Sequence, residues 1–136
     1  MRSGFLAFTA FFAFAAGGCS SSSGPNLDSN MQLTSLSAGD QTKLCDWEAQ
    51  QYGGYGKAVM CGGLLAAQRG PADQASCVSD LPPSSTAMYC QVTVGQFENC
   101  VRWRVQKGCS GTMAMPPTDC TALRNPNCSL ADAGGD

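Results

Sequence analysis

The stretch Thr93–Lys107, with the sequence TVGQFENCVRWRVQK, carries the clearest structural signal in the chain. Thr93 is followed three residues later by Gln96, a pattern in which both side chains bond backbone N–H groups at the start of a helix. Apolar residues then recur at helical spacing, as Val94, Phe97, Val101 and Val105, and Gly108 is a typical helix stop. The pattern predicts a helix over Val94–Lys107 that turns Phe97, Val101 and Val105 inward and bonds Cys100 to another segment.

Weaker helical patterns lie on both sides of this helix. Ser37 and Asp40 resemble a second capping box, and Gly53-Gly54 predicts the end of a helix over Ala38–Tyr52. Pro71 can occupy the first turn of a shorter helix that reaches Asp80 and ends before Pro82-Pro83. Met88–Val92 is predicted as a short extended piece, and Asp119–Leu123 as one helical turn.

Nine cysteines mark the chain as disulfide-rich. The last eight are Cys45, Cys61, Cys77, Cys90, Cys100, Cys109, Cys120 and Cys128. No Cys-x-x-Cys pair occurs, which argues against zinc-ribbon, iron–sulfur and thioredoxin-like sites, because these need two close sulfurs. We expect four disulfides, whose pairing the spacing leaves open among 105 possibilities. The predicted fold class is small, disulfide-rich and mainly α, with long loops and few or no strands.

Composition excludes several kinds of chemistry. The chain of 136 residues has no histidine, so it holds no Ser/His/Asp or Cys/His catalytic site and no His-liganded zinc. Its net charge of −2 gives no basic footprint for nucleic acid. Asp46 and Glu48 lie two apart on a predicted helix, point to different faces and cannot share a catalytic proton. We predict no catalytic residue, no metal site and no cofactor, and therefore a protein that is not an enzyme.

Four aromatic residues have competing interpretations. Trp47 and Trp103 follow cysteines on predicted helices, and we interpret them as core residues packed over disulfides, with ligand stacking as the alternative. Tyr52 and Tyr55 flank a glycine turn and are predicted to be an exposed pair.

Three cations lie together in the last turns of the helix over Val94–Lys107, at Arg102, Arg104 and Lys107. Positive charge there favours the helix dipole, which is the preferred interpretation of this basic patch. The alternative is a site for anionic lipid or polysaccharide.

Residues Met1–Gly18 predict a secretory leader. Arg2 supplies a positive charge, and the apolar run Phe5–Ala16 is shorter than the roughly 20 residues of a transmembrane helix. The run ends in Ala16-Gly17-Gly18-Cys19, followed at once by four serines. Here the chain resembles bacterial lipoprotein precursors. The resemblance implies that the Cys19 sulfur receives diacylglycerol, that cleavage makes Cys19 the new N-terminus, and that fatty acyl chains anchor it in a membrane.

Ordinary secretion, with cleavage after Ala13-Phe14-Ala15, is the alternative. Cysteine number favours lipidation, because a thioether at Cys19 leaves eight cysteines, whereas ordinary cleavage leaves an odd thiol in an oxidising compartment. Ser20 after the cysteine resembles lipoproteins that are sent to the outer membrane. The implied location is the bacterial cell envelope, on the outer membrane, with the lipid as the membrane contact.

The predicted organisation has four parts. Residues 1–18 form the signal peptide, 19–35 a lipid-anchored flexible Ser/Gly linker, 36–128 the cysteine-rich domain and 129–136 a flexible tail. A linker of about 16 residues has a typical reach of roughly 20 to 25 Å.

Three functions compete at this level. The first is a surface-anchored structural or binding module that recognises an unknown protein or polysaccharide, and the mature domain resembles small cysteine-rich lipoproteins of unassigned activity. The second is a secreted inhibitor or effector that presents Arg69-Gly70-Pro71 or Met113–Pro117 as a rigid loop. A hydrolase that uses only Asp and Glu ranks last, because no paired carboxylates support it.

Overall fold

The structure, a computed structural model, describes residues 23–60, 67–107 and 115–128. The helices in these ranges are α1 (Ala38–Gln51), α2 (Gln74–Asp80), α3 (Val94–Lys107) and α4 (Thr118–Leu123), and the strands are β1 (Ala58–Met60) and β2 (Ala67–Arg69). Short 3-10 turns occupy Leu33–Ser35, Ser84–Thr86 and Pro126–Cys128. The predicted fold class, small, disulfide-rich and mainly α, is confirmed.

The two long helices begin where their capping residues predict. The Thr93 hydroxyl accepts from the Gln96 backbone N–H, and the Gln96 side chain accepts from Thr93 in return, at 3.3 and 3.0 Å. Ser37 accepts from the Asp40 N–H in the same way. Gly53 and Gly54 have φ of +89° and +124°, a backbone conformation that other residues rarely adopt, and they end α1 at Gln51.

Shorter elements differ more from the prediction. Asp73 and not Pro71 starts α2, because Asp73 and Ser76 form a capping box. Met88 and Tyr89 lie in a turn and not an extended piece, since the N–H groups of Tyr89 and Cys90 donate to the Thr86 carbonyl. The antiparallel strands β1 and β2 have three residues each, too few for an alternating apolar pattern in the sequence to predict them.

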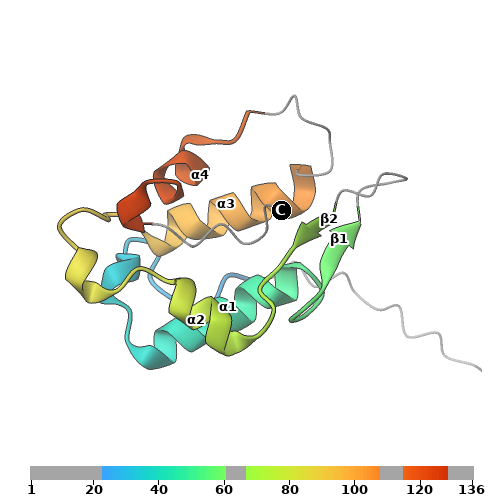
Figure 1. The fold of residues 1–136 in the computed structure, drawn as a ribbon, viewed down its shortest axis with the longest axis horizontal. Coiled ribbons are helices and arrows are strands. Elements are labelled where there is room, and N and C mark those ends of the chain that lie inside the picture. The colour runs from blue at the N-terminus through green and yellow to red at the C-terminus, as the bar shows by residue number, and fades with distance from the viewer. Residues whose placement is uncertain (1–22, 61–66, 108–114, 129–136) are drawn as a thin grey trace, which may run out of the picture.

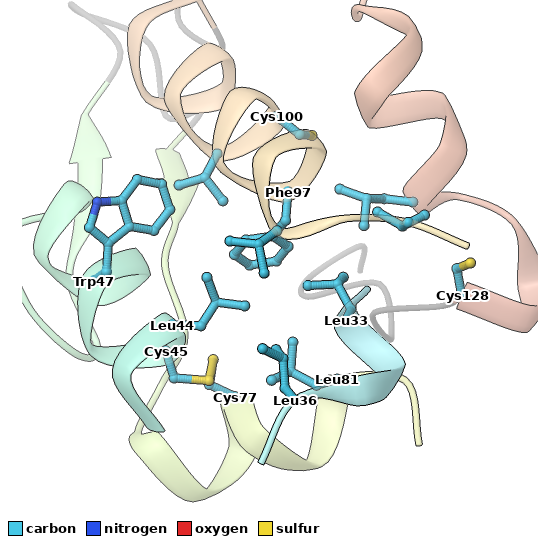
Figure 2. Close-up of a cluster of buried hydrophobic side chains, with 14 of the residues drawn as sticks. Leu33, Leu36, Leu44, Cys45, Trp47, Cys77, Leu81, Phe97, Cys100 and Cys128 are labelled. Atoms are coloured by element: carbon cyan, nitrogen blue, oxygen red, sulfur yellow. A yellow bond between two sulfur atoms is a disulfide. The ribbon is translucent and has the colours of Figure 1, made fainter. Parts of the chain in front are cut away.

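Helices α1 and α3 form the centre of the molecule, with α2 packed on α1 and α4 on α3 (Figure 1). Phe97 of α3 lies in the middle of the core, near Leu44 of α1 and Leu33 (Figure 2). Phe97 and Val101 are each only 1% exposed, so their predicted inward orientation is confirmed. Val105 is partly buried at the margin of the same core.

Three disulfides connect the described segments. Cys45–Cys77 joins α1 to α2, Cys100–Cys120 joins α3 to α4, and Cys90–Cys128 joins the segment that precedes α3 to the 3-10 turn Pro126–Cys128. Each closes a loop of 20 to 38 residues, a constraint worth about 3 to 4 kcal/mol in the chain-entropy model. Cys61 and Cys109, also predicted to be bonded, lie outside the described residues.

The folded domain begins earlier than residue 36, the predicted boundary. Leu33 is fully buried, and Leu27 and Met31 pack against the core. The N–H of Val94 donates to Met31, and that of Gly95 donates to Ser29. Residues 23–35 are therefore part of the fold and not a linker, because their few apolar side chains bury against a helix some 60 residues away in sequence.

Candidate functional site

Ionisable side chains gather where α1, α2 and α3 meet, and we call this group the Glu48 cluster. It contains Glu48, Tyr52, Asp80 and Arg104, beside the Cys45–Cys77 disulfide. Three and four residues along a helix place side chains on one face, so α1 presents Cys45, Glu48 and Tyr52 together. Arg104 comes from α3, and Asp80 is the last residue of α2.

Glu48 is the most perturbed acid of the cluster. Burial raises the pKa of its carboxyl to about 7, and the negative charge of Asp80 acts in the same direction, while Arg104 opposes both. Its Oε2 lies 3.5 Å from Cys77 Sγ. A disulfide sulfur carries no hydrogen, so a hydrogen bond between these atoms has to be donated by the protonated carboxyl. The contact and the raised pKa therefore favour the same neutral form.

Tyr52 is buried, at 5% exposed, which corrects its predicted exposure beside Tyr55. Its ring lies against the backbone of Gly70, where an added Cβ would be 2.7 Å from the ring Cγ. Burial and the charge of Glu48 raise the pKa of the Tyr52 phenol, which is also hydrogen-bonded to Arg104. Tyr52 is buried because the end of α1 packs on Gly70, the residue after β2. The glycine-rich pattern around Tyr52 is local, so it carries no information about this distant contact.

Asp46 belongs to a separate network on the outside of α1. The Tyr55 hydroxyl and the Gln74 amide donate to Asp46 Oδ1 at 2.6 and 2.7 Å, and both bonds lower the pKa of Asp46. Burial and the bond to Asp46 raise the pKa of Tyr55 to about 12. The prediction that Asp46 and Glu48 face apart is confirmed, since each has its own partners. The Asp46 network joins the turn after α1 to the start of α2.

Trp47 is a core residue as predicted, since it is only 3% exposed. The group that lies over its ring is an arginine and not a disulfide. The Arg102 guanidinium carbon lies 5.5 Å from the ring centroid, and the same guanidinium donates to Glu98 Oε2 at 2.8 Å. The buried indole Nε1 has no hydrogen-bond partner among the described residues. Trp103 is partly buried and packs against the core.

The predicted basic patch is divided between two environments. Arg102 is held by Glu98 and Trp47, whereas Arg104 faces Glu48 and Tyr52. The side chain of Lys107 lies outside the described residues. The two arginines therefore stabilise tertiary contacts, and the helix dipole alone does not account for their placement.

The other predicted site residues are dispersed. In the loop Arg69–Pro71, Gly70 packs on Tyr52 and the Pro71 carbonyl accepts from Gly56. Of Met113–Pro117 the structure describes only the last three residues, and Met115 is 89% exposed. Cys19 lies outside the described residues. Among the residues that are described, no group of three or more acids or cysteines is placed to hold a metal ion, and no helix is long and apolar enough to cross a membrane.

The cluster presents a carboxyl, packed between three helices, whose raised pKa lets it exchange a proton near neutral pH. The sequence does not predict the cluster directly, because Asp80 and Arg104 come from two other helices. The available signal was the i, i+3 spacing of Cys45 and Glu48, which places an acid beside a cysteine on the buried face of α1.

No protein-family model matches the chain, and neither the curated proteins nor the solved structures contain a match to it.

Proposed function

We propose that this protein is a lipid-anchored component of the bacterial cell envelope, whose disulfide-stabilised domain serves as a structural or binding module and not as an enzyme. Fatty acyl chains on Cys19 hold it in a membrane, which we take to be the outer membrane. The partner belongs to the envelope or its surroundings and is a protein or a polysaccharide.

Cysteine pairing is the observation that carries this proposal. The three disulfides of the described residues use six cysteines, and none of them involves Cys19. Cys61 and Cys109 are the remaining two of the later eight. If they bond to each other, every cysteine of the domain is used and only Cys19 is left, at the end of the Ala-Gly-Gly-Cys sequence where acylation would occur.

The placement of the charged residues supports a module over a hydrolase. Asp46, Glu48 and Glu98 each face side chains of the domain itself. Asp46 holds a turn, Glu98 pairs with an arginine, and Glu48 is packed between helices. These roles stabilise the fold. Hydrolysis by carboxyl groups requires two acids that face a common space, whereas Glu48, the acid that shares its cluster with Asp80, is packed between helices.

The test is the replacement Cys19→Ser in the native host, followed by separation of membrane and soluble fractions. The unmodified protein is expected in the membrane fraction with the added mass of diacylglycerol, and Cys19→Ser in the soluble fraction without it. Ser20→Ala, which leaves the sulfur in place, is the matched control and is expected to stay with the membrane. Recovery of the unmodified protein in the soluble fraction would favour the secreted inhibitor or effector instead.

A further inference from the structure

We infer that the face formed by residues 23–31 is turned toward the headgroups of the bilayer that holds the Cys19 acyl chains. The inference rests on the proposed acylation of Cys19 and adds an orientation to it. It comes from the number of residues between the anchor and the first part of the chain that is fixed to the domain.

Residues 23–31 are attached to α3 at several points. Gly24 lies so close to Glu98 that an added Cβ would be 3.0 Å from the carboxylate Oε2. Pro25 is buried and Leu27 packs against the core. Further along, the carbonyls of Ser29 and Met31 accept from Gly95 and Val94, at 2.9 and 2.8 Å. Gly24 is thus part of the folded domain.

Only five Cα-to-Cα steps separate Cys19 from Gly24. However the residues between them are arranged, they span at most about 18 Å, because an extended chain covers 3.3 to 3.6 Å per residue. One headgroup layer takes up roughly 5 to 8 Å of that length. The remainder is about the diameter of one helix, so Gly24 cannot stand further than that from the membrane surface. The reach of roughly 20 to 25 Å, expected for a flexible linker up to residue 35, does not apply, because residues 23–35 belong to the fold.

The chemistry of this face suits headgroups and not the hydrocarbon core. Its exposed side chains are polar, namely Ser23, Asn26, Asp28, Ser29 and Asn30. Residues 23–31 contain no lysine or arginine, and Arg102, which pairs with Glu98 beside Gly24, already has an acidic partner, so charge attraction to anionic lipid is not what this face offers. The short connection to Cys19, and not insertion or charge, holds the face in place.

Helix α2 provides the contrasting face. Residues 23–31 hydrogen-bond to the start of α3 and approach Glu98 of the same helix, whereas α2 packs on α1 and is joined to it by the Cys45–Cys77 disulfide. We therefore expect α2 to lie further from the bilayer than residues 23–31.

The experiment uses the acylated full-length protein in phosphatidylcholine nanodiscs that contain a small fraction of lipid with a gadolinium chelate on its headgroup. Paramagnetic broadening of backbone amide signals then reports distance from the headgroups. We expect Ser29 and Asn30 to broaden several-fold more than Ser76 and Ser79 of α2. Equal broadening of the two groups, or stronger broadening of α2, in protein whose Cys19 acylation is confirmed by mass would overturn the orientation and leave the anchor intact.

A longer connection tests the cause. Twelve Gly/Ser residues inserted between Ser22 and Ser23 are expected to reduce the broadening of Ser29 and Asn30 to the level of α2, whereas the same twelve residues after Asp136 leave it unchanged. Persistent broadening with the longer connection would mean that the chain length is not what holds this face, and would contradict the inference. A mass that shows no acyl group on Cys19 would refute the proposed function itself, together with this orientation.

Discussion

Two glycines at the second position of their helices show how one residue can report a tertiary contact. Gly39 of α1 has open surroundings, since an added Cβ would meet only Ser37 Oγ at 3.9 Å. At Gly95 of α3, an added Cβ would lie 3.0 Å from the Ser29 carbonyl oxygen and 3.1 Å from Ser29 Cβ. The same substitution should therefore have opposite effects at the two positions.

Gly39→Ala is expected to raise the free energy of unfolding by up to about 1 kcal/mol, because alanine is the better helix former. Gly95→Ala is expected to lower it by about 1 to 2 kcal/mol, because the methyl group displaces residues 29–31 from α3. Urea denaturation of both variants beside the unmodified protein measures the two changes. An equal gain for both would show that residues 23–31 are not packed on α3.

Glu48 gives the protein a pH dependence with a defined sign. Its carboxyl has a pKa of about 7 in the folded protein against an ordinary value of 4.5, so the folded state retains a proton that the unfolded chain loses. The stability that this proton supplies is complete below about pH 4.5 and is lost as the pH rises through 7. The free energy of unfolding should fall by up to about 3 kcal/mol over this range.

Glu48→Gln should flatten this profile, because the amide cannot ionise. Urea denaturation at a series of pH values from 4.5 to 8 is the measurement. The chain has no histidine, so few other side chains titrate in this interval. Asp46→Asn is the matched control. The pKa of Asp46 is lowered in the folded protein, so the stability that its charge contributes is complete above about pH 3.8 and is lost only in more acidic solution. A slope in Glu48→Gln equal to that of the unmodified protein would mean that another group is responsible.

At the scale of elements, α4 depends on its attachment to α3. Six residues are too few for a stable helix in water. The Cys100–Cys120 disulfide, the buried Leu123 and a hydrogen bond from Asn99 to Asp119 hold it in place. Replacing both cysteines by alanine should destabilise the protein by about 3 kcal/mol.

The same double variant should lose hydrogen-exchange protection in α4 before α1 does, since α1 keeps its own bond to α2. Asn99→Ala is the control, because it removes only an exposed hydrogen bond and should change stability by less than about 1 kcal/mol. Simultaneous loss of protection in α1 and α4 would contradict a separate attachment of α4.

At the scale of the whole molecule, cysteine bonding can be tested by mass. Three disulfides are present among the described residues, and a fourth requires Cys61 and Cys109 to bond to each other. Alkylation without reduction should label no cysteine of the acylated protein, and a digest should contain one peptide pair that joins the segments around these two residues. Labelling of both Cys61 and Cys109 would contradict the fourth disulfide while leaving the other three intact.

The sequence by itself determined the elements whose signals lie within a few turns. Thr93, Gln96 and the spacing of Phe97 and Val101 predicted the observed bounds of α3, because caps and periodic burial act over neighbouring residues. Ser37 and the glycine pair after Tyr52 did the same for α1, with its end one residue earlier. The absence of histidine, and the disulfide-rich helical class, also follow from the sequence alone.

Only the tertiary structure decided which distant residues meet. The three disulfide pairings, the burial of Tyr52 on Gly70 and the attachment of Gly24 to Glu98 join segments 18 to 74 residues apart. The pKa of Glu48 likewise depends on Arg104 and Asp80, which come from two other helices. Burial and electrostatic contact depend on distance in space, and no local pattern in one chain specifies which surfaces will cover a given side chain.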